Sequence, residues 1–250
     1  MENYLKKSYT ATISDVDFNS RLSLASLLKE YQFLATEHSK IMGMSYFDLM
    51  KNDKAFWVLS KIKVKILKAL PNWGDAFSVL TYPKAPTNVR YGRNFKVFDE
   101  DENLLAISSS EWCILDVEAR KLRRASSITS YPNELKCLDE SLETENYTNI
   151  DDALNDNMLP LFEKVVRTTD LDMNLHMNNV VYTKIVLDCF SANFLKEHQI
   201  REYELHFIKE APEGTKIDVY KKEVDDNIVI FGKSTDKLLT YFKAVINFDL

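Results

Sequence analysis

Two stretches of the chain carry the same polar pattern directly before a helical pattern. Residues 15–23 read Asp-Val-Asp-Phe-Asn-Ser-Arg-Leu-Ser, and residues 170–178 read Asp-Leu-Asp-Met-Asn-Leu-His-Met-Asn. Two aspartates and one asparagine therefore recur at the same positions of both stretches. The Ser and Asn residues that follow suit the N-cap of a helix, because their side chains accept hydrogen bonds from free backbone N–H groups. The repeat predicts a chain built from two similar halves.

The order of elements after each stretch supports this interpretation. Apolar residues recur at helical spacing over residues 24–35 and again over residues 181–195. Segments with alternating apolar and polar residues, which is typical of half-buried strands, follow each helix. In the first half they are Ala55–Leu67, Phe77–Tyr82, Val89–Asp99 and Leu104–Asp116; in the second they are Glu202–Glu210, Lys216–Val224, Asn227–Lys233 and Leu238–Phe248. Each half is predicted to be one long helix followed by an antiparallel sheet.

The stretch between the halves is acidic, polar and without clear periodicity, so we expect a connecting segment there. The predicted limits are 1–130 for the first domain, 131–157 for the connection and 158–250 for the second domain. At 250 residues, with 45% hydrophobic residues, the chain can bury a sizeable core without support from a disulfide or a metal.

Composition excludes several classes of function. The net charge of −6 argues against a general nucleic-acid binder, which needs Lys and Arg to neutralise phosphates. Only five glycines occur, where average usage gives roughly 17, and no G-x-G-x-x-G motif is present. Residues 232–234 (Gly-Lys-Ser) look like the end of a phosphate-binding loop, but Asn227 occupies the place of its first glycine, so a strand end or turn is expected.

Cysteine usage and hydropathy predict a cytoplasmic protein. The three cysteines are widely spaced and form no C-x-x-C pair, so neither a zinc motif nor a disulfide framework is expected, and no metal or cofactor is predicted. The first ten residues are polar, and no apolar run approaches the ~18 residues that cross a membrane.

The second polar stretch is the strongest candidate for chemistry. Asp172, Asn174 and His176 occupy alternating positions, and in an extended segment alternate side chains share one face. They would converge at a helix N-terminus, where free N–H groups favour developing negative charge, as in the polarisation of a carbonyl. The first half has Arg21 in place of the histidine, so only one half would be catalytic. A polar helix cap with a surface histidine is the alternative.

Residues 172–182, which read Asp-Met-Asn-Leu-His-Met-Asn-Asn-Val-Val-Tyr, resemble the D-x-N-x-H-x-N-N-x-x-Y signature of acyl-ACP thioesterases. These enzymes end fatty-acid synthesis in plants and occur in many bacteria. Residues 111–124 (Glu-Trp-Cys-Ile-Leu-Asp-Val-Glu-Ala-Arg-Lys-Leu-Arg-Arg) resemble the family's tryptophan strand, which ends in an aspartate and a basic cluster. The resemblance extends over most of the chain. It implies an α+β fold with two tandem hotdog domains, each an antiparallel sheet wrapped around a long central helix.

The resemblance also implies site residues. Asp172, Asn174 and His176 match the family's catalytic positions, and Glu210 matches its glutamate. Plant members carry a cysteine after that glutamate, but this chain has Ala211, so we expect hydrolysis by a water that Glu210 activates as general base. Cys189 lies on the apolar stripe of the second helix and is expected in the core.

Substrate and carrier sites follow from the same resemblance. The acyl chain would lie in the first domain, and the residues predicted to bind substrate are Leu27, Tyr31, Leu34, Met42, Trp57, Asn178 and Asn179. Further apolar candidates there are Met44 and Phe47. Acyl carrier protein, the expected partner, is strongly acidic and would bind a basic patch at Arg120, Lys121, Arg123 and Arg124. A second patch could include Lys84, Arg90 and Arg93. Ordinary core packing and a solvated charged face are the alternatives.

Two other functions remain compatible with these residues. One is an acyl-CoA thioesterase, which would use the same chemistry on another carrier. The other is a hotdog protein that binds acyl thioesters without cleaving them, although binding alone needs no general base. Because hotdog proteins commonly pair, a homodimer is a candidate assembly.

Overall fold

The computed structural model describes residues 3–132, 137–154 and 158–249. Within them the chain forms two compact units, residues 1–145 and 146–250. The point of division lies inside the segment 131–157 that was expected to connect the halves, and parts of that segment, 133–136 and 155–157, lie outside the described residues.

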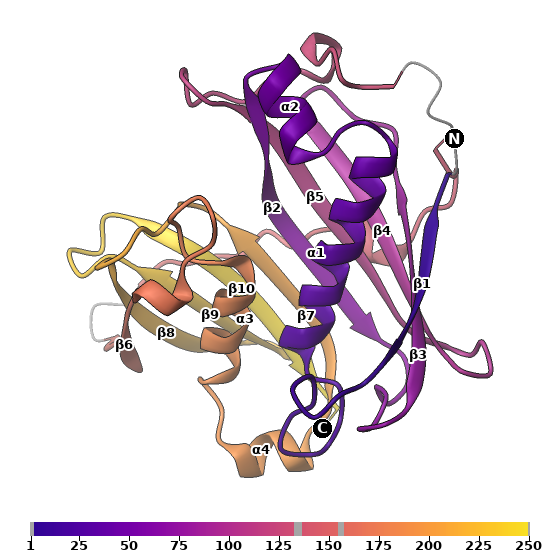
Figure 1. Ribbon diagram of the computed structural model, residues 1–250. Helices are drawn as coiled ribbons and strands as arrows, with labels where there is room; N and C mark the ends of the chain where they lie inside the picture. Colours follow the sequence, from indigo (N-terminus) through magenta and orange to yellow (C-terminus); the bar gives the residue numbers. More distant parts are fainter. Residues whose placement is uncertain (1–2, 133–136, 155–157, 250) are drawn as a thin grey trace. The chain divides into compact units, whose positions relative to one another are not determined.

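The first unit is an antiparallel sheet with a long helix across one face (Figure 1). The strand order is β1-β3-β4-β5-β2. The elements are β1 (Leu5–Thr10), α1 (Leu24–Ile41), α2 (Tyr46–Asn52), β2 (Ala55–Ile66), β3 (Ala76–Pro83), β4 (Arg90–Asp99), β5 (Leu104–Asp116) and a short 3₁₀ turn, η1 (Ala125–Ser127).

Capping and periodicity explain α1. The Ser23 side chain accepts a hydrogen bond from the Ser26 backbone N–H and starts the helix. Residues Leu27, Tyr31 and Leu34 then form a fully buried stripe at helical spacing. Tyr31 stacks on Phe95 of β4 with ring centroids 4.4 Å apart, so this stripe packs on the sheet.

The second unit repeats the arrangement on a smaller scale. Its strand order is β7-β10-β9-β8-β6, again antiparallel. The elements are β6 (Phe162–Val165), α3 (Asn179–Leu187), α4 (Ala192–Glu197), β7 (Ile200–Phe207), β8 (Lys216–Val224), β9 (Asn227–Lys233) and β10 (Thr240–Phe248), with a 3₁₀ turn, η3 (Thr168–Asp170), before α3. The predicted order of elements, a helix followed by an antiparallel sheet, is confirmed in both units.

The second helix differs from the prediction. The apolar pattern predicted one helix through Leu195, but α3 ends at Leu187 and a new helix begins after Ser191, which caps α4 by accepting from the Phe194 N–H. Phe190, in the break, packs against Phe248 with ring centroids 5.0 Å apart. An apolar spacing that continues across a break cannot reveal it, although α4 itself has no buried residue. The predictions also omitted β1 and β6, which are the edge strands of the two sheets.

Gly232 lies within β9, near its end. A Cβ atom there would collide with the side chains of Phe242 and Ile217. This residue is therefore a glycine because two strand side chains fill its place, and the phosphate-loop interpretation stays excluded.

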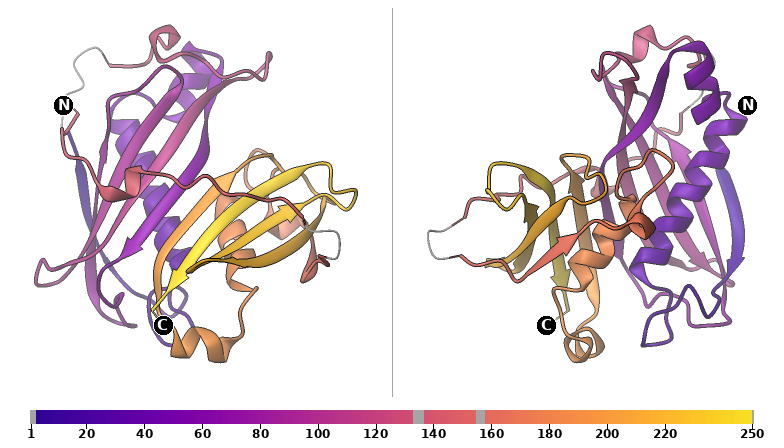
Figure 2. Two further views of the ribbon diagram at one scale, coloured as in Figure 1. Left: turned by 180° about the vertical axis from the view of Figure 1, so that it is seen from behind. Right: turned by 60° about the vertical axis from the view of Figure 1, so that its left-hand side comes forward.

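The connecting segment, residues 137–154, is hydrogen-bonded to both sheets. In the first unit it crosses the sheet face opposite α1 (Figure 2), where Thr144, in the 3₁₀ turn η2 (Glu143–Glu145), bonds to Ser109 at 2.7 Å. In the second unit the Thr148 N–H donates to Glu204 Oε1 at 2.7 Å, and Asp152 lies 2.7 Å from Lys243 Nζ. Its acidic composition therefore reflects specific pairing with the two sheets.

Candidate active site

Residues 172–176 form a tight turn just before α3, and not the extended segment that was expected. The Asp172 N–H donates to His176 O at 2.8 Å, and the Leu175 N–H donates to Asp172 O at 3.0 Å. Leu175 has a φ of 61°, in the left-handed region. The Asp172 carboxylate favours this turn because it accepts from the backbone N–H of Asn174 at 2.8 Å. The argument from alternating side chains on one face was therefore wrong.

The turn places His176 beside Glu210. Met177 N–H donates to Ala211 O at 2.8 Å, and His176 forms an isolated bridge with Pro212, so the loop after β7 lies against the turn. His176 Nε2 is 3.6 Å from Glu210 Oε2, and the two side chains are 28% and 35% exposed. An imidazole and a carboxylate at this separation, both reachable by water, can exchange protons with a bound substrate.

The first unit has the same turn with different side chains. Asp17 Oδ1 accepts from the Asn19 N–H at 2.7 Å, Ser20 has a φ of 58°, and the Leu22 N–H donates to Pro71 O at 2.7 Å. The position of His176 is taken by Arg21. Because Leu22 bonds to Pro71 as Met177 bonds to Ala211, Leu70 occupies the place of Glu210. The backbone of the repeat is therefore preserved, while Arg21 and Leu70 stand in the first unit where the second has His176 and Glu210.

The other predicted residues of this stretch have distinct places. Asn178 is the N-cap of α3 and its side chain accepts from the Val180 N–H at 2.9 Å, while Asn179 is the first residue of the helix. The Asn174 side chain is exposed near the tip of the turn. The Asp172 carboxylate accepts hydrogen bonds from the backbone N–H groups of Asn174 and His176, both within the turn.

Tyr182 is a neighbour of the site to which the sequence assigned no role, although it is the last residue of the signature. Its side chain is buried, with its ring edge-on to Phe207 and to Phe242. Burial raises the pKa of Tyr182, and the negative charges of Glu210 and Asp172 raise it further. The phenol therefore lies within the field of both carboxylates and stays protonated.

The structure also places Cys189, the cysteine that the sequence predicted in the core. Cys189 is buried, its thiol donates to Ile185 O at 3.4 Å, and burial raises its pKa to about 12, which confirms the core position. Among the described residues no three His, Cys, Asp or Glu side chains form a group that could hold a metal ion.

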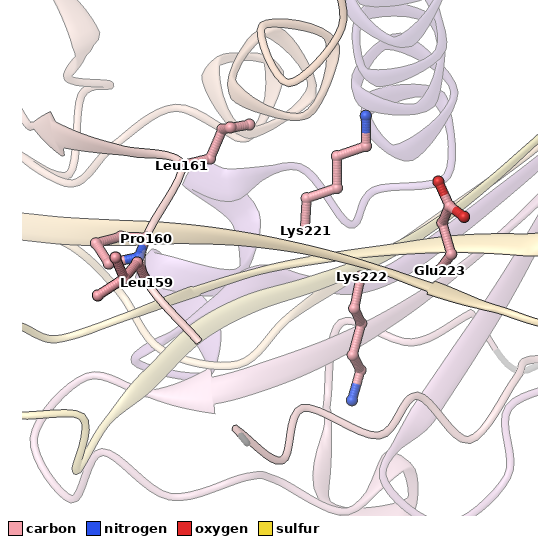
Figure 3. A pocket seen from close by; sticks show the side chains of 6 residues that line it. All are labelled: Leu159, Pro160, Leu161, Lys221, Lys222 and Glu223. Carbon is pink, nitrogen blue, oxygen red and sulfur yellow. The ribbon is translucent and has the colours of Figure 1, made fainter. Parts of the chain in front are cut away.

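The residues predicted to bind the acyl chain lie in the interior of the first unit. Leu27, Tyr31 and Leu34 are fully buried on α1, and Met42 caps its end. Trp57 Nε1 donates to Met44 O at 2.8 Å and packs with a core cluster that includes Tyr91. Phe47 is 76% exposed, on the outer side of α2. A hollow of about 540 Å³ lies elsewhere, between residues 159–161 and Lys221, Lys222 and Glu223 of β8 (Figure 3), and contains none of the predicted site residues.

The basic residues that follow β5 differ in their surroundings: one is held in the loop and three are exposed. Arg123 Nη1 lies 3.2 Å from Asp116 Oδ2 and donates to Asp53 O at 3.1 Å, so it holds the loop in place. Arg120, Lys121 and Arg124 are exposed. In the second suggested patch, Arg93 is buried and cannot face a partner at the surface.

Comparison with known proteins agrees with this architecture. Residues 2–129 match the family model of the acyl-ACP thioesterase N-terminal domain, and residues 160–247 match that of the C-terminal domain. The oleoyl-acyl carrier protein thioesterase of Coriandrum sativum is 21% identical over 247 residues, which is 90% of this chain and 64% of the relative. The palmitoyl-acyl carrier protein thioesterase of Cuphea hookeriana is 25% identical over 225 residues, 84% of this chain and 51% of the relative. The chain thus spans only part of the length of these relatives.

Two solved structures are similar over their full length. An acyl-ACP thioesterase from Bacteroides thetaiotaomicron superposes with a TM-score of 0.88 at 24% identity, covering 99% of this chain and 98% of that one. The 12:0-ACP thioesterase of Umbellularia californica gives a TM-score of 0.82 at 18% identity, covering 100% and 98%. These likenesses show the fold, which is two hotdog units in tandem. No helix in the described part of the chain is long and apolar enough to cross a membrane.

Proposed function

The chain belongs to the acyl-ACP thioesterase family, and on that basis we propose that it hydrolyses acyl-acyl carrier protein to a free fatty acid. The observation that carries the proposal is the 3.6 Å approach of His176 Nε2 to Glu210 Oε2, in the one unit of the repeat that has both residues. Family membership supports the reaction class, and the half-buried pair, which water can reach, supports the place where it occurs.

The proposed mechanism is direct attack by water. The Glu210 carboxylate accepts a proton from a water molecule, whose oxygen attacks the carbonyl carbon of the thioester. His176 and Asn174, with the N-terminal N–H groups of α3, would orient the carbonyl and stabilise the negative oxygen. The C–S bond then breaks, and the proton held by Glu210 passes to the leaving thiolate. Asp172 would keep the turn, and with it His176, in position.

We propose that the carrier protein binds the exposed basic side chains Arg120, Lys121 and Arg124. Their charge complements an acidic carrier, and their side chains are exposed, whereas Arg123 is partly buried by its contacts in the loop. Hydrolysis of acyl-CoA is the second candidate, since the same pair would act on either thioester. A rate comparison on both carriers separates the two.

Location and assembly are also proposals. The free cysteines Cys113, Cys137 and Cys189 fit a reducing cytoplasm. A homodimer is proposed from the frequency of pairing among hotdog proteins, and sedimentation of the purified chain tests it.

The activity is tested by incubating the purified chain with acyl-ACP of several chain lengths. We expect free thiol and free fatty acid in equal amounts, and we expect both to be lost in Glu210→Gln. No thiol release with any chain length, from a folded protein, would reject hydrolysis in favour of a protein that only binds acyl thioesters.

A further inference from the structure

The hydroxyl of Tyr182, on α3, is a hydrogen-bond donor that the fold itself does not use. The ring packs edge-on against Phe207 and Phe242, with centroids 5.4 Å and 5.6 Å away, and the residue is 3% exposed. The hydroxyl has no hydrogen-bond partner in the described part of the chain, yet it is not sealed from solvent as the hydroxyls of Tyr31 and Tyr220 are. A polar atom that touches solvent at the end of a firmly packed ring is available to a bound molecule.

The surrounding elements place this hydroxyl near the pair of His176 and Glu210. Tyr182 lies at the end of the first turn of α3, and side chains on a helix lean toward its N-terminus, which here follows the turn that carries His176. Phe207, which the ring contacts, is the last residue of β7, three positions before Glu210. Burial raises the pKa of Tyr182 most, and the charges of Glu210 and Asp172 raise it further, so the phenol lies close enough to feel both carboxylates.

The repeat offers an internal comparison for this residue. The alignment that places Asp17 opposite Asp172 also places Leu27 of α1 opposite Tyr182. Leu27 is fully buried and its side chain has no polar atom. Packing between helix and sheet is therefore satisfied by a leucine in the first unit. The hydroxyl occurs in the unit that carries the imidazole and the carboxylate, where a buried polar group needs a reason beyond packing.

We propose that the Tyr182 hydroxyl donates a hydrogen bond to the carbonyl oxygen of the bound thioester and stabilises the negative charge that forms there when water attacks. The identity of this substrate rests on the proposed function. The phenol keeps its proton throughout, because Glu210 takes the proton of the attacking water and passes it to the leaving thiolate. Tyr182 thus joins the N–H groups of α3 as a donor fixed in place before the charge develops.

The first test is the rate of Tyr182→Phe, which removes only the hydroxyl and no hydrogen bond of the described fold. We expect kcat for acyl-ACP to fall about 10²-fold, the usual cost of one oxyanion donor. KM should stay within about twofold, because the bond strengthens only as the charge forms. The control is Tyr220→Phe, which removes another unpartnered hydroxyl, in a cluster with Ile150, and should keep the wild-type kcat. A wild-type kcat in Tyr182→Phe would overturn the proposal.

The pH profile separates a donor to the substrate from a residue that only positions Glu210. The profile of kcat/KM reports groups of the free protein, in which the Tyr182 hydroxyl makes no hydrogen bond to the described residues. Its acid limb should therefore lie at the same pH in Tyr182→Phe as in the wild type. A displaced acid limb would mean that the phenol acts through Glu210 and not on the substrate.

An alkyl trifluoromethyl ketone tests the donor without turnover. In water this ketone forms a tetrahedral hydrate, which resembles the adduct of water with a thioester. By calorimetric titration we expect Tyr182→Phe to bind it about tenfold more weakly than the wild type, and Tyr220→Phe to bind it equally well. Equal affinity in Tyr182→Phe rejects the donor role, whether or not the wild type releases thiol. Weaker binding by Tyr182→Phe, with no thiol release by the wild type, rejects only the hydrolysis.

Discussion

His176 Nε2 and Glu210 Oε2 lie 3.6 Å apart, although 33 residues of helix and strand separate them in the chain. Two short backbone contacts create this approach, from Met177 N–H to Ala211 O and across the bridge of His176 with Pro212. The same contacts exist in the first unit around Leu22 and Pro71. The same backbone geometry therefore occurs in both units, and the two positions differ in side-chain identity, His176 and Glu210 against Arg21 and Leu70.

Glu210→Gln should reduce kcat by about 10²–10⁴-fold, the usual contribution of a general base. The side chain is 35% exposed, so the melting temperature should change little. Steady-state rates of thiol release, with circular dichroism for folding, measure both effects. The control is Glu213→Gln, three residues on in the same loop and also exposed, which should keep the wild-type rate. Full activity in Glu210→Gln would remove the glutamate from the mechanism.

Asp172→Ala should lower both stability and activity, whereas Asp17→Ala should lower stability alone. Each carboxylate accepts hydrogen bonds from backbone N–H groups of its own turn. Each replacement should therefore cost about 1 kcal/mol of unfolding free energy, as for a lost helix cap. Only the Asp172 turn carries the histidine. Denaturant unfolding and kcat of the two variants check this. Equal loss of activity in both variants would mean that Asp172 affects the rate only through the stability of the whole protein.

The repeat could be predicted from the sequence because polar turn residues and helix caps have local causes. Asp17 and Asp172 make their hydrogen bonds within four residues, so their pattern is visible in the chain itself. The turn geometry was nevertheless mistaken for an extended segment. The positive φ of Leu175 is uncommon for a leucine, so the residue type gave no indication of it.

Interactions between distant residues could not be predicted in the same way. The pairing of Glu210 with His176 came only from resemblance to a family, since 33 positions separate the two residues. The buried place of Arg93 and the structural use of Arg123 were missed, because a charged residue in a sequence is normally expected at the surface. The break between α3 and α4 was missed because apolar spacing continues through it.

Lys121→Glu combined with Arg124→Glu should raise KM for acyl-ACP several-fold and leave KM for acyl-CoA unchanged. Both side chains are exposed, so the reversal changes the local potential without removing a structural contact. The effect should shrink as salt is added, because long-range attraction is screened. The comparison variant is Arg123→Ala, which loses the contacts to Asp116 and Asp53 and should lower the melting temperature. Equal KM changes on both carriers would contradict a carrier site here.

Cys189→Ala should retain kcat. The thiol is buried and its pKa is raised to about 12, so almost no thiolate exists at neutral pH to act as a nucleophile. The loss of a buried sulfur should cost about 1 kcal/mol of stability. Thiol release by the variant and its resistance to iodoacetamide are the measurements. A fall in kcat larger than the loss of folded protein would instead indicate that Cys189 acts as a covalent nucleophile.

Asp152→Asn should destabilise the protein near neutral pH and much less in acid. Burial alone would raise the pKa of Asp152, but hydrogen bonds from Lys243, Thr240 and Lys233 outweigh it and hold the pKa well below its usual range. A carboxyl group with a lowered folded-state pKa contributes stability above its unfolded pKa of about 4, and this contribution is lost as the pH falls below that value. Melting curves from pH 7 to pH 3 should therefore show the gap between wild type and variant narrowing below about pH 4. The control is Asp226→Asn in the exposed turn after β8, which should show no gap. A gap for Asp152→Asn that stays constant across this range would mean that the connecting segment does not depend on this charge.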